Sequence, residues 1–409
     1  MAEPAALIAQ VVPLLDQVTA DASRGFAAAR PELSRRLEQS VAGDPRLGSL
    51  VEAGGLALTF GPAPVHAAFW TSVFELKLAG LLVTTLGWMD TVHGARGIPG
   101  PCHPRLAGHW IRAVEEALPR AWAGPINDVY RWIARRREPW PELSPGTGAA
   151  VPAGRGEAML PAFLDGLVNG LQLDCLHLAQ AQVKSPADLG SFFTRVAAPA
   201  LDQVGRLWQT GRITVAGQQR ASAIARLTID TLFPLLMPFQ LRHGKVLIAC
   251  PAREAHDLGA RMLADLLGYE GWDVDFLGAG REDHEILGAI WQGCPHVLGL
   301  SLAVPFDLGQ VRRLIARARQ EPGFRGSKVI VGGNLIRNHP GLWRRLGADG
   351  HAPDARAAIR VLGRWWRTRT GCTKSGTDTS AQGPSSRSFR RRRRRRTRAP
   401  SSTVALGFL

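Results

Sequence analysis

The stretch Lys245-Val-Leu-Ile-Ala-Cys250, followed directly by Pro251-Ala-Arg-Glu-Ala-His-Asp-Leu-Gly259, decides the fold. Its first half is a short apolar run that ends at a proline, which is typical of a buried strand. Its second half is a polar loop with a carboxylate and an imidazole, and a periodic apolar segment, Leu258–Leu267, begins where the loop ends. A buried strand that leads through a polar loop into a helix predicts the first half of a βαβ unit.

The same alternation continues to residue 366. The further strand candidates are Trp272–Phe276, His296–Ser301 and Ser327–Val331, and the helix candidates are Glu282–Trp291, Leu308–Arg319 and a segment after Arg356. Short strands separated by helices of this length predict a doubly wound parallel α/β sheet over residues 243–366. Such sheets bind ligands at the carboxyl ends of their strands, where the strand order reverses. The loops after Cys250, Ser301 and Val331 are therefore the candidate binding loops.

These loops carry residues suited to a metal and a bulky ligand. Glu254 precedes His256 by two residues, and a carboxylate that accepts the second ring N–H of a histidine fixes the tautomer of a metal-ligating imidazole. Gly259 lets the next helix begin close to a ligand. The third strand ends in Ser301-Leu302, and the fourth is followed by Gly332-Gly333, where missing side chains leave a groove.

Together these motifs resemble the cobalamin-binding domain, whose usual signature is DxHxxG, SxL and GG. The resemblance implies a flavodoxin-like fold that holds the corrinoid base-off, with His256 as the lower cobalt ligand and Glu254 as its orienting carboxylate. It also implies cofactor contacts from six further residues of these loops: Asp257, Gly259, Ser301, Leu302, Gly332 and Gly333. Two departures are visible: glutamate replaces the usual aspartate, and Ala303 stands where the pattern has leucine.

The helical zone upstream, residues 157–242, contains Trp208-Gln-Thr-Gly-Arg-Ile-Thr-Val-Ala216. This stretch resembles the four-helix cap over the upper corrin face in methionine synthase, methyltransferase corrinoid proteins and adenosylcobalamin photoreceptors. In those photoreceptors the tryptophan packs at the upper axial group, and a Glu-His pair follows it. Gln218 and Gln219 occupy those positions here. Glutamine can still hydrogen-bond a ribose hydroxyl, but it is a poor cobalt ligand, which leaves His177 as an alternative.

The first 138 residues predict a separate all-α domain with long amphipathic or buried helices over Val65–Met89 and His109–Ala134. No turn followed by a recognition helix is visible before Leu160, so direct sequence-specific DNA binding is not expected. His93 and His103 flank a Gly/Pro-rich loop. The tryptophans nearby predict a core, but either histidine could instead contact a second tetrapyrrole, bilin or haem.

Composition describes the rest of the 409-residue chain. A Pro/Gly-rich linker is expected at residues 139–156 and a disordered tail at 367–409. The formal charge is +16, of which ten basic residues and one acid after Gly371 give the tail +9. The Arg390–Arg396 run could bind phosphates without sequence preference or have little function. The longest apolar run, Leu78–Met89, is too short to span a bilayer, so no membrane partner is expected.

Five cysteines without a CxxC motif predict neither a disulfide framework nor a zinc site, and favour a reducing cytoplasm. The sequence therefore predicts a cytoplasmic cobalamin-binding sensor, light-responsive and acting in signal transduction and transcription regulation, with adenosylcobalamin or methylcobalamin as cofactor. We expect a homo-oligomer or a regulatory protein partner, and a binding protein more than an enzyme. The alternatives are a corrinoid carrier within a methyltransferase, and a haem or bilin sensor built on the same domain.

Overall fold

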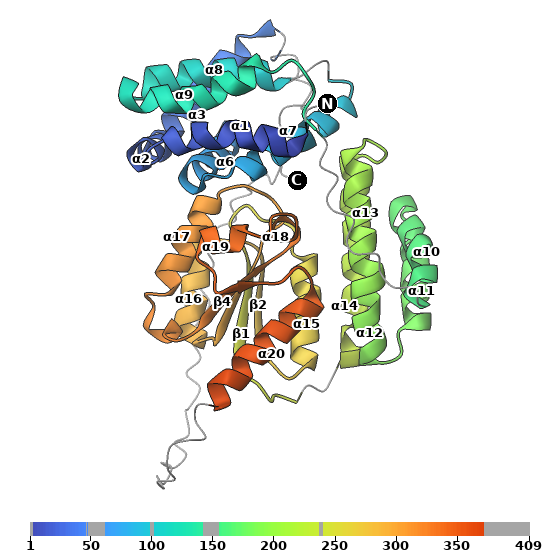
Figure 1. Ribbon diagram of the computed structural model, residues 1–409. Helices are drawn as coiled ribbons and strands as arrows, with labels where there is room; N and C mark the ends of the chain where they lie inside the picture. Colours follow the sequence, from blue (N-terminus) through green and yellow to red (C-terminus); the bar gives the residue numbers. More distant parts are fainter. Residues whose placement is uncertain are drawn as a thin grey trace, which may run out of the picture.

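The chain folds into an N-terminal helical domain, a helical cap and an α/β domain (Figure 1). The computed structural model describes residues 3–45, 47, 62–98, 102–141, 155–236 and 240–371. The Arg390–Arg396 run and most of the expected linker lie outside the described residues.

The α/β domain is built on five parallel strands in the order β2-β1-β3-β4-β5. Their bounds are β1 Lys245–Pro251, β2 Asp273–Arg281, β3 Val297–Ser301, β4 Lys328–Gly332 and β5 Gly350–His351. This is the flavodoxin-like order, which confirms the predicted doubly wound fold. The sequence pattern gave no sign of β5, because two residues are too short to show a period.

Helices cover both faces of this sheet, and the period-2 alternation of the strands decides which core each residue joins. Val246, Ile248 and Cys250 of β1 pack with helices α15 (Leu258–Tyr269) and α20 (Ala355–Gly371). Leu247 and Ala249 point to the other face, toward α16 (Asp283–Gly293) and α17 (Leu308–Ala318). The short elements η3, α18 and α19 complete the domain at Pro322–Phe324, Asn334–Asn338 and Leu342–Leu346. Helix α20 continues to Gly371, past the end expected at residue 366.

The cap consists of helices that pack on α15. They are α10 Arg155–Asn169, α11 Gln172–Gln182, α12 Pro186–Phe192 with the π-turn η1 Phe193–Ala197, α13 Ala198–Gln209, α14 Val215–Leu232 and η2 Phe233–Leu236. Leu258, Met262 and Leu266 of α15 belong to the same apolar core as the cap. Figure 1 shows α13 and α14 next to the α/β domain and α10 and α11 on the outside.

The described residues of the N-terminal domain form helices, as expected, but the prediction of two long helices is wrong because each is divided in two. Its helices are α1 Pro4–Gln17, α2 Ala20–Ala28, α3 Arg30–Ala42, α6 Ala63–Leu76, α7 Ala79–Gly94, α8 Cys102–Ala117 and α9 Arg120–Arg135. Lys77 separates α6 from α7 in a left-handed conformation (φ 53°), and its Nζ donates to the carbonyl of Leu15 at 2.6 Å. Pro119 begins α9. The apolar pattern continues across both breaks, so it conceals them.

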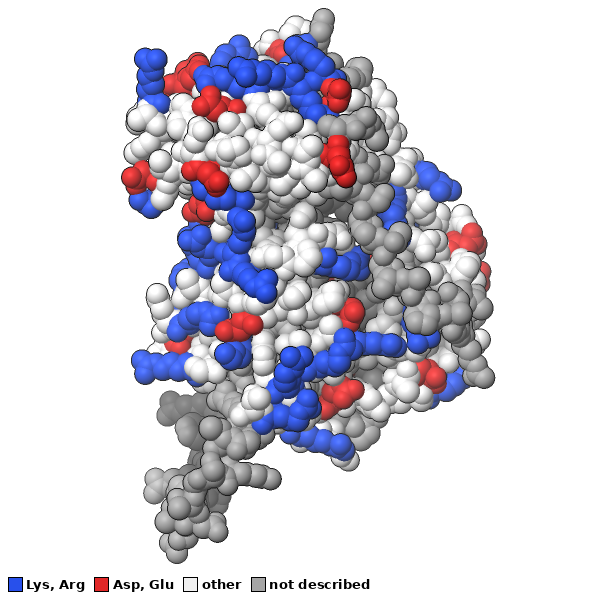
Figure 2. All heavy atoms as spheres, in the orientation of Figure 1, with Lys and Arg blue, Asp and Glu red and all other residues white. Residues whose placement is uncertain are grey.

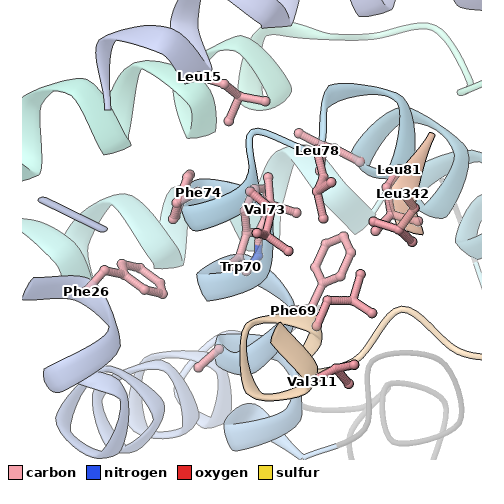
Figure 3. Packing of buried hydrophobic residues seen from close by; sticks show 14 of the residues in the cluster. Leu15, Phe26, Phe69, Trp70, Val73, Phe74, Leu78, Leu81, Val311 and Leu342 are labelled. Carbon is pink, nitrogen blue, oxygen red and sulfur yellow. The ribbon is translucent and has the colours of Figure 1, made fainter. Parts of the chain in front are cut away.

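The N-terminal domain packs against the α/β domain through α6, α7, α17 and α19. Phe69 and Leu81 share a continuous apolar core with Val311 and Leu342 (Figure 3). Because a buried apolar core resists separation, this contact fixes the two domains relative to each other.

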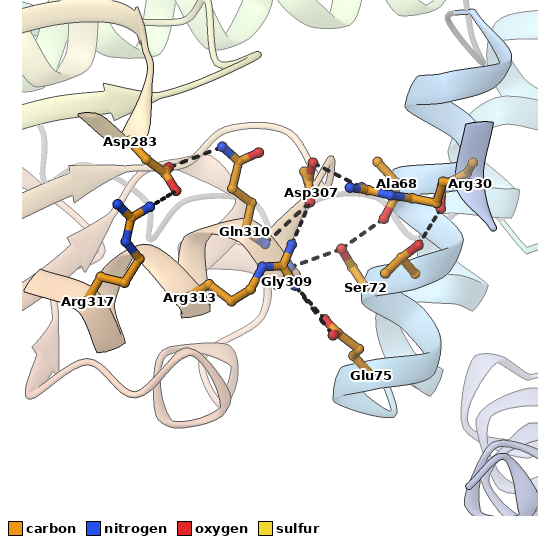
Figure 4. Close-up of polar contacts among 12 residues, drawn as sticks. Arg30, Ala68, Ser72, Glu75, Asp283, Asp307, Gly309, Gln310, Arg313 and Arg317 are labelled. Carbon is orange, nitrogen blue, oxygen red and sulfur yellow. Dashed lines mark hydrogen bonds and ion pairs between the residues drawn. The ribbon is translucent and has the colours of Figure 1, made fainter. Parts of the chain in front are cut away.

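Polar contacts surround that core (Figure 4). The Gly309 N–H donates to Ser72 Oγ at 3.2 Å, and Arg313 pairs with Glu75 at 3.3 Å. Arg30 pairs with Asp307, the N-cap residue of α17, at 3.4 Å. Since α17 follows the carboxyl end of β3, the N-terminal domain is held beside the edge where ligands of this fold bind.

Basic and acidic side chains are interspersed on the face that Figure 2 shows. Figure 2 shows Lys and Arg side chains along the top of the helical domain and across the α/β domain, with Asp and Glu side chains among them. Among the described residues, no helix combines the length and the apolar character that crossing a bilayer requires.

Candidate functional site

The strand order reverses between β1 and β3. Helix α15 leaves the end of β1 toward one face of the sheet, and α17 leaves the end of β3 toward the other. A reversal of this kind opens a crevice at the carboxyl edge. The loops after β1 and β3, which carry the predicted Glu254, His256 and Ser301, meet there.

Glu254 connects these two loops. It is 3% exposed, and its Oε2 accepts hydrogen bonds from the backbone N–H groups of Ala303 at 2.6 Å and Val304 at 3.0 Å. Its Oε1 accepts from the backbone N–H of His256 at 3.0 Å and lies 2.7 Å from Nδ1 of the same residue. Both oxygens act as acceptors, so the site requires an ionised carboxylate at this position.

His256 is held in the orientation that a metal ligand needs. With Nδ1–H donated to Glu254, the lone pair is on Nε2. The side chain of His256 is 52% exposed, whereas that of Glu254 is 3% exposed. The hydrogen bond to Glu254 raises the pKa of His256 above its ordinary value, and burial opposes the rise. Since a proton on Nε2 competes with a metal ion, metal ligation by His256 is expected to weaken as the pH falls through this pKa.

Glu254→Gln tests this arrangement. An amide has one acceptor and one donor end, so in either orientation it places N–H donors against N–H donors, at Ala303 and Val304 or at His256. We expect cobalamin affinity to fall about 10- to 100-fold, the usual cost of losing a group that orients a metal ligand. Equilibrium titration followed by absorbance measures it, and Glu254→Asp, which stays acceptor-only, should retain more affinity. Equal affinity of Glu254→Gln and the unaltered chain would contradict the assignment.

Asp257 and Gly259 follow at the start of α15. Asp257 is 8% exposed and pairs with Arg226 of cap helix α14. This carboxylate, predicted to contact the cofactor, therefore links the cap to the α/β domain. A Cβ atom at Gly259 would meet no atom within 4 Å. The helix thus leaves open space beside the loop, as a bulky ligand requires.

The ends of β3 and β4 lie in register, with Ser301 opposite Gly332. The N–H of Leu302 donates to the carbonyl of Gly332 at 2.9 Å, and the side chain of Leu302 is 3% exposed in the apolar core. Leu302 therefore offers backbone, not side chain, to this edge. Gly333 has a φ of 95°, and a Cβ there would lie within 2.8 Å of the backbone carbon and nitrogen of Leu302, and closer still to its oxygen. Only glycine fits this position.

The predicted cap residues lie on the two cap helices nearest the α/β domain. Trp208 is at the end of α13, and Gln218 and Gln219 are in the first turns of α14. Trp208 Nε1 and Gln218 Oε1 are buried without a hydrogen-bond partner. Gln219 is exposed, and His177 is exposed on the outer helix α11. An ion pair between Asp202 of α13 and Arg337 of α18, at 2.8 Å, connects the cap to the loop after β4.

These features fit a corrinoid. An imidazole with an accessible Nε2, a glycine-lined edge and two unsatisfied buried polar atoms on the cap are the donor set and the space that such a cofactor needs. When bound, cobalamin would supply a cobalt–carbon bond at its upper face. His256 would hold the metal from below, Gly259, Ser301, Gly332 and Gly333 would border the nucleotide tail, and Trp208 and Gln218 would face the upper group.

The sequence did not predict the residues that connect the two ligand loops to each other, or the cap to the α/β domain and the N-terminal domain. The N–H groups of Ala303 and Val304, which fix Glu254, have no side-chain signal. Three arginines also contact a partner on another element: Arg226, Arg337 and Arg96. Arginine is too common in this chain for these three to stand out in the sequence.

The comparisons with known proteins agree with this geometry. Residues 244–360 match the family described as B12 binding domain, and residues 160–232 match a second family with the same description. The HTH-type transcriptional repressor CarH of Myxococcus xanthus is 30% identical over 154 residues, 38% of this chain and 50% of that protein. The repressor CarA of the same organism is 31% identical over 185 residues, 44% of this chain and 60% of that protein. The chain thus spans about half the length of the curated relatives it matches.

Two solved structures are also similar. A cobalamin-binding protein from Desulfitobacterium hafniense DCB-2 is 20% identical, with 50% of this chain and 98% of that chain covered and a TM-score of 0.30. The monomethylamine corrinoid protein of Methanosarcina barkeri is 20% identical, with 51% and 99% covered and a TM-score of 0.44.

The fold and the site define a doubly wound α/β domain with a histidine–carboxylate pair at its ligand-binding edge. With the two family matches beside them, residues 244–360 of the chain are a B12 binding domain, and residues 160–232 match a second family of that description. The predicted resemblance is confirmed.

One expectation is wrong. The absence of a visible recognition helix before Leu160 was the ground for expecting no sequence-specific DNA binding, yet both curated relatives are HTH-type transcriptional repressors. Side chains, backbone N–H groups and helix ends that a fold brings together can all contact DNA. A pattern missing from one segment therefore does not exclude them.

Proposed function

We propose that this chain is a cobalamin-binding sensor in which His256 ligates cobalt from below and the cap reports the state of the upper face to the N-terminal helical domain. The single observation that carries the proposal is the fixed Glu254–His256 pair, with Nε2 of His256 accessible at the ligand edge of the sheet. Supporting it are the family matches over both the cap and the α/β domain.

Adenosylcobalamin or methylcobalamin is the cofactor that the cap suits. Trp208 offers a buried indole N–H and Gln218 a buried amide oxygen, and neither atom has a hydrogen-bond partner. An adenosyl group has ribose hydroxyls and ring nitrogens that would satisfy them. Without such a group those atoms stay unsatisfied, so the cap has two states of different stability. The chemistry that the cofactor would supply is a light-sensitive cobalt–carbon bond.

Helix α7 of the N-terminal domain is the element placed to sense that change. The Trp88 ring lies 6.2 Å from the Trp208 ring, and the Arg96 guanidinium stacks on Trp208 at 4.7 Å from its centroid. Arg96 also donates to the carbonyl of Trp208 at 3.1 Å. A movement of Trp208 must therefore change contacts on α7. Control of transcription is the output that the names of the curated relatives suggest. The thiols of Cys175, Cys250 and Cys294, which form no disulfide, favour a reducing cytoplasm as its location.

Visible spectra of the full chain test the proposal. The purified protein is incubated in the dark with adenosylcobalamin, methylcobalamin or haemin, desalted, and recorded before and after green light. We expect retained corrinoid and a light-dependent change of spectrum. Photochemical silence with methyl transfer to a thiol acceptor would favour a corrinoid carrier, and haem retention alone would favour a haem sensor. A chain that stays colourless with every corrinoid would overturn both the sensor and the carrier.

Arg96→Ala tests the connection to α7. In the unaltered chain we expect illumination to change amide hydrogen exchange in the last turns of α7. In the variant the absorbance change should remain while the exchange change at α7 disappears, because the stacking and the hydrogen bond to Trp208 are gone. Arg105→Ala on α8, which removes a partly exposed ion pair with Asp44, is the matched control. An exchange change that persists at full size in Arg96→Ala would contradict this path.

A further inference from the structure

Two histidines and an aspartate that the proposed function does not use meet inside the N-terminal domain. Asp90 and His93 lie one turn apart on α7, and His103 lies at the start of α8. One ligand atom from each lies within 4.8 Å of the others. His93 and His103 are each 2% exposed, and their rings are 6.0 Å apart. From the sequence, a contact of either histidine with a second tetrapyrrole was the alternative to a core. The structure brings both histidines to a carboxylate, with the three ligand atoms close enough to share one ion.

We propose that Asp90, His93 and His103 bind a divalent first-row transition-metal ion of the kind that zinc represents. Two imidazoles and one carboxylate are a common three-ligand set for such ions. Bonds of about 2.0–2.2 Å to each ligand atom would place the atoms about 3.3 Å apart. His103 Nε2 already lies 3.0 Å from Asp90 Oδ1. Small rotations of the side chains would complete the set.

The surroundings of the three groups suit a metal. The backbone N–H of Trp140 donates to Asp90 Oδ2 at 2.9 Å. This hydrogen bond orients the carboxylate, as hydrogen bonds to metal-ligating side chains commonly do. The carbonyl of Leu86 lies 3.1 Å from His103 Nε2 and adds an oxygen donor at the same place. The ion would thus join three segments: α7, the start of α8 and the stretch after α9.

Such a site would be structural and would not depend on a corrinoid. It clamps the last turns of α7, which lead into the turn that carries Arg96, to α8. The competing interpretation is that the aspartate and the two histidines are held by hydrogen bonds without a metal. A second histidine–aspartate pair in the same domain serves as the control. His109 of α8 pairs with Asp44 at 3.1 Å, with a side chain 4% exposed.

Metal analysis of the full, untagged chain tests the proposal. The protein is expressed in medium supplemented with zinc, desalted, and analysed by mass spectrometry for all first-row metals. We expect about one equivalent of one metal in the unaltered chain and in His109→Gln, and background levels in Asp90→Asn, His93→Gln and His103→Gln. Circular dichroism establishes that each variant is folded, and because the corrinoid is absent, failure of the cobalamin proposal cannot affect the result.

Thermal unfolding provides a second measurement. After chelator treatment, added ZnCl₂ should raise the melting temperature of the unaltered chain and of His109→Gln, because a ligand that binds the folded state stabilises it. It should leave Asp90→Asn, His93→Gln and His103→Gln unchanged. Metal at background level in the unaltered chain, or equal retention and equal stabilisation in the three ligand variants, would overturn the proposal in favour of the hydrogen-bonded cluster.

Discussion

His256→Ala is expected to lower the affinity of the full chain for adenosylcobalamin by at least about 100-fold, the upper end of what losing a mere orienting group costs. The substitution removes the imidazole whose Nε2 is accessible at the sheet edge and leaves Glu254 with its bonds to Ala303 and Val304. The fold should therefore be retained while ligation is lost. Titration followed by absorbance gives the affinity, and any corrinoid still bound should show a changed lower-axial spectrum.

The matched control for this variant is His284→Ala, an exposed histidine of α16. It should bind cobalamin as the unaltered chain does. If His256→Ala kept full affinity and the same lower-axial spectrum, His256 would not be the cobalt ligand, and the proposed function would lose its carrying observation.

Gly333→Ala is expected to destabilise the α/β domain by about 2–5 kcal/mol. A left-handed conformation costs a residue with a side chain about 1–2 kcal/mol, and forced overpacking against neighbouring atoms adds about 1–3 kcal/mol. Here the obstacle is the backbone of Leu302, which is bonded on both sides: its N–H donates to Gly332 and its carbonyl accepts from Leu335 at 3.1 Å. Relief of the clash would separate the loops after β3 and β4, so cobalamin binding should fall with stability.

Gly326→Ala separates the two causes. Gly326 has a φ of 74°, but a Cβ there would meet nothing within 4 Å. It should therefore show the conformational cost alone, about 1–2 kcal/mol. Urea unfolding of both variants measures the difference. An equal loss of stability would mean that the close approach to Leu302 does not constrain this edge.

The α/β domain could be predicted from the sequence because its signals are local. A buried apolar run such as Lys245–Cys250, a polar loop and a periodic helix repeat along the chain, and each boundary fell within a few residues of the observed element. The breaks at Lys77 and Pro119 were not predicted, because the apolar residues keep their helical spacing across them. The first depends on a bond from Lys77 to the end of α1, which only the tertiary structure supplies.

The candidate site likewise has local features that the sequence predicts and long-range contacts that it does not. The Glu254–His256 pair could be predicted because the two residues are neighbours in sequence, and the structure places them in direct contact. The roles of the site residues toward a cofactor stay predictions. The contacts of Trp208 with Trp88 and Arg96 could not be predicted, since more than a hundred residues separate the partners and helical spacing carries no information about them.

The claim that His256 ligates cobalt is tested most directly by electron paramagnetic resonance of cob(II)alamin bound to the chain, with histidine labelled by nitrogen-15. The nuclear spin of the axial nitrogen splits the cobalt signal, and natural nitrogen gives triplets whereas nitrogen-15 gives doublets. We predict triplets with unlabelled protein and doublets with labelled protein. Triplets that persist in the labelled protein would show that the cofactor keeps its own base, and would contradict the account.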